Sequence, residues 1–161
     1  MIAIALGANL PSKIGAPIKT LMDALDQFAN HGLIVLDRSH WYETAPVPAS
    51  DQPLYVNGAV VIDTDRSPKE TLKVLLSIED VYERERGELN AARTLDLDVL
   101  DFNGRVEQGP PILPHPRLEN RGFVLFPLRD IVPQWLHPVS GKGIDALISK
   151  LPDGGVIRRI S

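Results

Sequence analysis

Apolar residues recur along the chain with two different periods, and the period identifies each expected element. Residues 2–6 form a short apolar run that predicts a first strand. In residues 16–29 the apolar side chains stand three and four positions apart, which predicts an amphipathic helix. Two further runs, 33–41 and 54–64, favour strands because they are rich in β-branched and aromatic residues. The expected helical stripe comprises Ile18, Leu21, Met22, Leu25 and Phe28.

A second helix is expected to begin after Ser67, where three signals of a helix start coincide. Ser67 is a candidate N-cap, Pro68 occupies the first helical position, and Glu70 stands where a capping box needs it. The pattern carries this helix to about Tyr82. Residues 83–92 are polar and have no period, so they predict a loop.

Two carboxylates, Asp96 and Asp98, interrupt an otherwise apolar segment that reads as a strand. Strand side chains alternate between faces, so both carboxylates point the same way. Such a pair repels unless a cation lies between its members, and Mg²⁺ commonly shares carboxylate ligands with substrate phosphates. The pair therefore predicts a magnesium site, with two ions as the arrangement suited to phosphate chemistry. Taken alone, the spacing is equally compatible with two solvent-facing aspartates on an edge strand.

The rest of the chain predicts a hairpin and two more helices. Asn103 and Gly104 form a hairpin turn, with residues 105–108 as the returning strand. Residues 120–131 and 144–151 suit helices. The order strand, helix, strand, strand, helix, strand is a doubled split β-α-β unit. We therefore expect an α+β fold, a ferredoxin-like sandwich of a mainly antiparallel sheet with helices packed on it, extended by the extra hairpin.

Length and composition narrow the class of protein. A chain of 161 residues with 43% hydrophobic residues is expected to fold as one domain covering 1–161. The absence of cysteine excludes disulfides, thiolate catalysis and zinc-thiolate sites. The apolar opening run is too short for a signal or membrane segment, so we expect a cytoplasmic protein without a membrane partner. A net charge of −4 argues against general nucleic-acid binding.

Arginine is concentrated in the middle of the chain. Seven of the eleven arginines lie between residues 84 and 129, and no lysine occurs from 74 to 141. The fixed fork of arginine suits a bidentate grip on phosphate oxygens, so this zone around an aspartate pair predicts a compact polyphosphate ligand. Pairing with nearby acidic residues is the alternative, and we prefer it for Arg105 and Arg129. The candidates for phosphate binding are Arg84, Arg86, Arg93 and Arg121.

Three other positions offer useful chemistry. His115 stands between two prolines, which fix the direction of its ring, and it could bind a phosphate or a leaving group. Asn57 alternates with Tyr55 on the third expected strand, and its amide can donate and accept at the edge of a heterocycle. Phe123 could stack on a planar ring. For each of them a core or loop-stabilising role is the alternative.

These pieces together resemble the 6-hydroxymethyl-7,8-dihydropterin pyrophosphokinase family, also called 2-amino-4-hydroxy-6-hydroxymethyldihydropteridine diphosphokinases. Its members are enzymes of folate biosynthesis that move diphosphate from ATP to a pterin alcohol. The resemblance covers nearly the full length. It rests on LGANL at 6–10, YETAP at 42–46, DQPLYVN at 51–57, RTLDLD at 93–98, PHPR at 114–117 and NRGFVL at 120–125.

The resemblance implies an Mg²⁺-dependent diphosphotransferase with ATP and the pterin alcohol as small-molecule substrates and AMP as a product. It implies two Mg²⁺ ions on Asp96 and Asp98. The implied catalytic residues are Arg93, Asp96, Asp98 and His115, with Arg84 and Arg86 on a mobile loop. ATP is expected to contact Glu79, Arg93, His115 and Arg121, and the pterin to contact Thr44, Ala45, Val47, Tyr55, Asn57 and Phe123. We expect a monomer or a weak homodimer.

Two departures from the family pattern and two rival functions stay open. Residues 89–92 are Leu-Asn-Ala-Ala where many members have Arg-Trp-Gly-Pro, so the loop is expected to close over substrate through different contacts. Ile112 stands where a polar residue near the ribose is expected. The aspartate pair would also suit a two-metal phosphodiesterase or a nucleotidyltransferase, the latter releasing pyrophosphate. A noncatalytic binding module of the same fold is the second rival.

Overall fold

The computed structural model describes residues 1–46, 49–82, 94–152 and 157–161. The expected loop at 83–92 and the candidates Val47, Arg84, Arg86 and Arg93 lie outside these ranges. The strands are β1 (Ile2–Ala8), β2 (Ile34–Arg38), β3 (Tyr42–Thr44), β4 (Tyr55–Asp63), β5 (Asp96–Phe102) and β6 (Ile157–Arg159). The helices are α1 (Pro17–Asn30), α2 (Pro68–Val81), the 3₁₀ helix η1 (Leu118–Asn120), α3 (Gly122–Ile131) and α4 (Ile144–Ser149).

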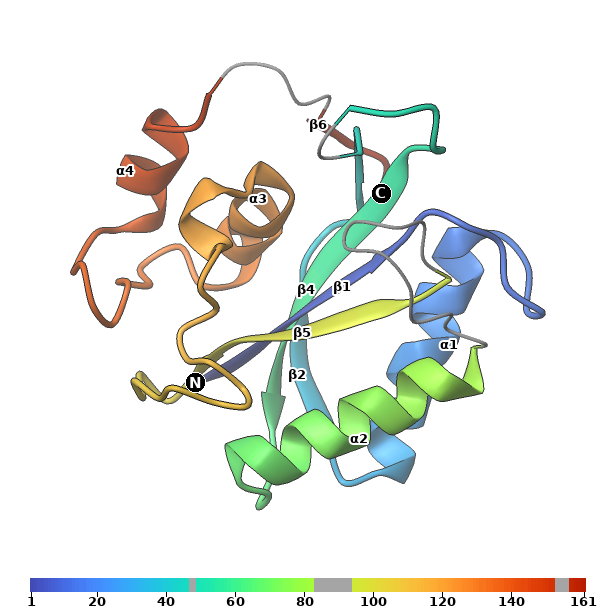
Figure 1. Ribbon diagram of the computed structural model, residues 1–161, viewed down its shortest axis with the longest axis horizontal. Helices are drawn as coiled ribbons and strands as arrows, with labels where there is room; N and C mark the ends of the chain where they lie inside the picture. The colour runs from blue at the N-terminus through green and yellow to red at the C-terminus, as the bar shows by residue number, and fades with distance from the viewer. Residues whose placement is uncertain (47–48, 83–93, 153–156) are drawn as a thin grey trace.

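One antiparallel sheet runs through the middle of the molecule (Figure 1). Its strand order is β5-β1-β4-β3-β6, and β2 pairs with β4 as well. Helices α1 and α2 cover one face, while α3 and α4 lie on the other (Figure 1). The α+β class, with helices packed on an antiparallel sheet, is therefore confirmed. The order β5-β1-β4-β2 is the arrangement of two interleaved β-α-β units.

Strand β1 carries large side chains on one face and small ones on the other. Its isoleucines and Leu6 belong to the core beneath α1 and α2. On the α3 face the same strand presents Ala3, Ala5 and Gly7. The large side chains build one core, and the small ones let a second core that includes Leu125 of α3 and Leu147 of α4 pack closely on the other face. The candidate site occupies that second face.

Helix α2 begins as its sequence predicts. The Ser67 hydroxyl accepts from the Glu70 N–H at 3.1 Å, and the Glu70 carboxylate accepts from the Ser67 N–H at 3.0 Å. Both bonds of a capping box are present, so two N–H groups at the helix start are satisfied. The helix ends at Val81, and the buried Tyr82 caps it. The hydroxyl of Tyr82 donates to Asp23 of α1 at 2.5 Å, which ties the two helices together.

The expected strand over 33–41 is instead two strands. β2 ends at Arg38 and β3 begins at Tyr42, and both pair with β4. Between them the Ser39 hydroxyl accepts from the Ala59 N–H and donates to the carbonyl of His40, so a side chain takes the place of a backbone acceptor in the ladder. The ring of Trp41 then packs on the backbone of Gly58, where a Cβ would lie 2.5 Å away. The three-residue strand β6 gave no sequence signal of its own.

The prediction of a returning strand at 105–108 is wrong. Asn103 and Gly104 do form a tight turn, with φ of 54° and 72°. After it only Glu107 pairs, in an isolated bridge with Leu113. Three prolines between 110 and 114 lack the N–H groups that a continuous ladder would need. Among the described residues, no helix is both long and apolar enough to cross a membrane.

Candidate active site

Asp96 and Asp98 share one face of β5, as the alternation of the strand predicts. Both side chains are half-buried, while Leu97 between them is buried on the opposite face. On β1, Asp96 lies opposite Gly7 and Asp98 lies opposite Ala5. The neighbouring strand therefore presents nothing larger than a methyl group beside the carboxylates. That arrangement leaves room for a ligand next to both of them.

Asn57, Gly7 and Asp96 form one row across three adjacent strands. Gly7 is the register partner of Asn57 on β4 and of Asp96 on β5. Partners in register share a face, so the amide and the carboxylate lie on the same side of the sheet. Two strand spacings separate their backbones, which is about 10 Å. A Cβ on Gly7 would lie only 2.5 Å from Oδ1 of Asn57, so the close approach requires glycine.

The amide of Asn57 is held in a fixed orientation. Its Nδ2 donates to Oγ1 of Thr44 at 2.7 Å, and both residues are buried. Oδ1 then lies above Gly7 as an acceptor. Tyr55 is the register partner of Thr44, and Ala45 follows directly after β3. The structure thus brings Thr44, Tyr55 and Asn57 together, as expected for residues of one subsite.

His115 reaches β5 on a loop, and its side chain lies beside Asp98 in the pocket. Its N–H donates to the carbonyl of Leu100 at 2.9 Å, which fixes the loop against the strand. Its Nδ1 accepts from the N–H of Arg117 at 3.2 Å, so the neutral ring carries its proton on Nε2. Burial lowers the pKa of His115 to about 4, and the nearby charges of Arg121 and Arg117 add to the effect. The imidazole is therefore a neutral donor at physiological pH.

Arg121 precedes α3 and faces the aspartates. Burial lowers its pKa, and the charges of Asp98 and Asp96 oppose that shift. Its guanidinium lies 5.2 Å from the centre of the Phe123 ring, within range of a cation–π contact. An arginine stays protonated in such a setting, so the site holds a fixed cation beside two carboxylates. Phe123 is brought to this corner of the site together with Arg121.

The two aspartates suit Mg²⁺ as ligands. Among the described ranges, no group of three or more His, Cys, Asp or Glu side chains is arranged around a metal position. A pair of carboxylates on a wide, partly exposed face is the donor set of an ion that completes its shell with water and substrate phosphates. Transition-metal sites use a richer set of nitrogen or sulfur ligands. The residues present therefore fit magnesium.

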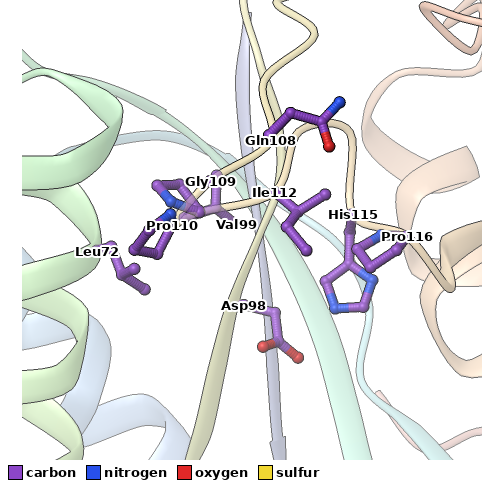
Figure 2. A pocket seen from close by; sticks show the side chains of 10 residues that line it. Leu72, Asp98, Val99, Gln108, Gly109, Pro110, Ile112, His115 and Pro116 are labelled. Atoms are coloured by element: carbon purple, nitrogen blue, oxygen red, sulfur yellow. The ribbon is translucent and has the colours of Figure 1, made fainter.

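A pocket of about 500 Å³ opens beside Asp98 (Figure 2). Figure 2 shows Leu72 of α2 on one side and His115 on the other, with Asp98 between them. Most of the remaining wall is apolar, from Val99 and from residues 109–112 of the proline-rich loop. An apolar wall ending in a carboxylate and an imidazole suits a flat ring attached to a charged chain.

A model of the 7,8-dihydro-6-hydroxymethylpterin-pyrophosphokinase (HPPK) family matches residues 3–133 of this chain. The chain belongs to this family. Its relatives include the 2-amino-4-hydroxy-6-hydroxymethyldihydropteridine pyrophosphokinase of Synechocystis, 39% identical over 92% of this chain and 74% of that protein. The enzyme of the same name from Methylorubrum extorquens is 36% identical over 93% of this chain and 95% of that protein.

The fold is also that of solved HPPK structures. The wild-type HPPK-DHPS of Plasmodium falciparum, solved with pteroate, superposes with a TM-score of 0.71 at 14% identity. The match covers 92% of this chain and 44% of the Plasmodium chain, so the present chain spans under half of that protein. The resemblance of folds agrees with the antiparallel sheet and its two helical layers.

Glu79, which the resemblance assigns to ATP, is buried beside β5. Its side chain has no exposed surface, and Oε2 accepts from the N–H of Leu97 at 2.8 Å. β5 lies at the end of the sheet, where a buried N–H needs a partner outside the ladder. Glu79 therefore supports the strand between the two aspartates, and a contact between Glu79 and ATP stays a prediction.

Several residues of the HPPK site gave no usable sequence signal. Leu72 and the loop residues 108–111 meet only because α2 packs beside the proline-rich loop, so no local period could reveal the pocket. Gly7 stood in a family motif, but its role depends on the strand register. Asn9, also buried, donates to Oε1 of Gln52 and to the carbonyl of Pro53, which anchors the loop before β4.

Proposed function

We propose that this chain transfers the diphosphate group of ATP to the hydroxymethyl group of 6-hydroxymethyl-7,8-dihydropterin, with Mg²⁺ as its metal. The observation that carries the proposal is the row of Asn57, Gly7 and Asp96 across three strands. It sets an amide suited to a heterocycle and a carboxylate suited to a metal on one face, with their backbones about 10 Å apart. In a chain of the HPPK family, this relation supports a pterin and a polyphosphate bound side by side.

In the proposed reaction the pterin hydroxyl oxygen forms a bond with the β-phosphorus of ATP. The bond from that phosphorus to the oxygen shared with the α-phosphorus breaks, AMP leaves with that oxygen, and the hydroxyl proton is released. Little covalent chemistry falls to the protein, because phosphoryl-type transfer depends on positioning and on charge stabilisation. The residues of this chain are therefore assigned to holding two substrates in line.

Asp96 and Asp98 are assigned to holding the metal. Bound Mg²⁺ would neutralise phosphate charge and orient the polyphosphate. Arg121 would grip phosphate oxygens from the α3 side, since it already faces the aspartates. The neutral ring of His115 would donate its Nε2 proton to a phosphate oxygen. The resemblance assigns the same work to Arg84, Arg86 and Arg93, which lie outside the described residues.

Asn57 is assigned to the pterin. Because Thr44 holds one N–H of its amide, the carbonyl oxygen and the second N–H keep a fixed direction toward a ring edge. Phe123 offers a face for stacking, with Tyr55, Ala45 and Val47 beside the ring. The apolar pocket of about 500 Å³ next to Asp98 would take the base and sugar of ATP.

One assay tests the proposal: purified protein is incubated with Mg-ATP and 6-hydroxymethyl-7,8-dihydropterin, and the nucleotide products are separated. Production of AMP in step with pterin diphosphate supports it. Release of pyrophosphate would indicate a nucleotidyltransferase, ADP a simple kinase, and the absence of turnover a binding module. Omission of the pterin is the control, because AMP formed without it would indicate hydrolysis.

We also infer that residues 1–161 act as one domain in the cytoplasm, as a monomer or a weak homodimer. Sedimentation of the purified chain at several concentrations would measure its association.

A further inference from the structure

A short segment after α3 contacts both β5 and η1. The segment, residues 135–143, is here called the brace. Trp135 is buried, and its Nε1–H donates to Oδ2 of Asp101 at 2.8 Å. Asp101 lies on β5, three positions after Asp98, and its Oδ1 accepts from the N–H of Gly104 at 3.0 Å. The brace is thereby fixed to the strand that carries the aspartates.

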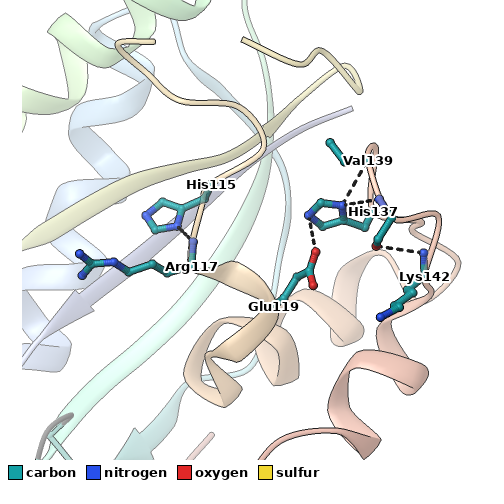
Figure 3. Close-up of polar contacts among 7 residues, drawn as sticks. His115, Arg117, Glu119, His137, Val139 and Lys142 are labelled. Carbon is teal, nitrogen blue, oxygen red and sulfur yellow. Dashed lines mark hydrogen bonds and ion pairs between the residues drawn. The ribbon is translucent and has the colours of Figure 1, made fainter. Parts of the chain in front are cut away.

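His137 makes the second contact of the brace, with Glu119 of η1. Its Nδ1 accepts from the N–H groups of Val139 and Ser140, both at 3.1 Å. A ring nitrogen that accepts two N–H groups carries no proton, so the proton lies on Nε2. Nε2 stands 3.1 Å from Oε1 of Glu119 and donates to it (Figure 3). The His137 N–H also donates to the carbonyl of Lys142 at 2.9 Å, which closes the turn that holds the ring.

Glu119 lies in η1, between two arginines that face the site. The charges of Arg121 and Arg117 lower the pKa of His115. The charges of Asp98 and Asp96 oppose the lowering of the pKa of Arg121. The N–H of Arg121 donates to the carbonyl of Leu118, so the backbone of Arg121 follows that of η1. A bond to Glu119 therefore restrains the turn from which these guanidinium groups extend. Figure 3 shows Glu119 held by His137 on the same stretch of chain as His115 and Arg117.

We propose that Trp135, His137 and Glu119 are positioning residues, which hold the two arginines that flank η1 at a fixed distance from the carboxylates of β5 and so set the grip on Mg-ATP. The inference rests on the proposed function. The whole brace lies after residue 133, where the match to the family model ends. Supporting residues of this kind typically change ligand affinity or activity by about tenfold to a hundredfold.

The test compares Glu119→Ala with Glu119→Gln. The side chain of Glu119 is 36% exposed, so neither change disrupts a core. Glutamine keeps an oxygen that accepts from His137, whereas alanine removes it. We expect Glu119→Ala to weaken binding of Mg²⁺ with a nonhydrolysable ATP analogue about tenfold and to raise KM for Mg-ATP equally. Pterin affinity should change less than twofold, and Glu119→Gln should stay within about threefold of the wild type.

Two further variants separate positioning from general stability. Trp135→Phe keeps an aromatic side chain but loses the indole N–H that donates to Asp101, and it should also weaken Mg-ATP binding selectively. Asp145→Asn removes the Arg129–Asp145 ion pair, which joins α3 to α4 away from the site, and it should change neither affinity. Unchanged Mg-ATP affinity in Glu119→Ala, or equal loss for both substrates with a lowered melting temperature, would overturn the inference. Binding is measured without turnover, so a wild type that binds nucleotide but makes no AMP contradicts the proposed function alone.

Discussion

Gly7 lies so close to Asn57 that even a methyl group between them would not fit. A Cβ at Gly7 would come within 2.5 Å of the amide oxygen, far inside contact distance. Gly7→Ala should therefore displace the amide and raise KM for the pterin at least tenfold, while KM for ATP changes little. Steady-state kinetics with each substrate varied in turn measure both effects. Gly143→Ala is the control for the pterin kinetics alone, because Gly143 lies in the brace and its Cβ would meet nothing nearer than 3.8 Å. Wild-type pterin kinetics in Gly7→Ala would contradict the role given to Asn57.

Thr44→Val tests the bond that orients the Asn57 amide. The change keeps the shape of the side chain but removes the oxygen that accepts from Nδ2. A buried hydrogen bond is worth about 1 kcal/mol, so pterin affinity should fall about fivefold in a direct binding measurement. Thr71→Val is a matched control, because the buried hydroxyl of Thr71 has no hydrogen-bond partner. That variant should bind pterin normally, and equal effects in the two variants would refute the assignment.

Asp96→Asn and Asp98→Asn should each lower Mg²⁺-dependent turnover by orders of magnitude. An amide keeps the size of the side chain but removes the charge that attracts the ion. Turnover measured against Mg²⁺ concentration should show a higher requirement for metal in both variants. Asp63→Asn, at the exposed end of β4, should leave the curve unchanged. Wild-type metal dependence in either site variant would exclude that carboxylate as a ligand.

The sequence predicted what depends on local pattern and missed what depends on register. The capping box of α2 and the shared face of Asp96 and Asp98 follow from short-range spacing, and both are present. The contact between Gly7 and Asn57 joins residues fifty positions apart in sequence, so no periodic pattern encodes it. The buried position of Glu79 depends equally on where α2 packs against β5. The failed strand at 105–108 shows that a correct turn does not ensure a partner when prolines follow.

His115 should make the stability of the fold depend on pH. Its pKa is about 4 when folded, below the ordinary value of 6.5, so between these values the unfolded chain binds more protons. Stability should therefore fall by about 1 kcal/mol per unit as pH drops from 6.5 toward 4. Urea unfolding of the wild type and of His115→Gln, measured from pH 7 to pH 4.5, isolates this contribution. The glutamine variant should lose less stability on acidification, and parallel profiles would rule out the effect.

Ser67→Ala should cost the fold about 1 kcal/mol, because it removes the side-chain oxygen that caps α2. Ser77→Ala on the exposed face of the same helix is the control. The hydroxyl of Ser77 only returns to the carbonyl of Lys73, so alanine should be neutral or slightly stabilising there. Denaturant midpoints of the two variants give the comparison. Equal midpoints would mean that the capping box contributes nothing measurable.

The backbone hydrogen bonds that join β4, β1 and β5 fix the distance between the two halves of the candidate site. The spacing of hydrogen-bonded strands is nearly constant, so the span from the Asn57 backbone to the Asp96 backbone cannot stretch to suit a longer substrate. An alcohol set one methylene further from the pterin ring would carry its oxygen about 1.5 Å past the point of attack. An error of that size is enough to cost about a hundredfold in rate. The main chain would thus select the length of the substrate, and point mutations can hardly change the spacing of the strands. Side chains would change only how tightly the pterin and the phosphate chain are held.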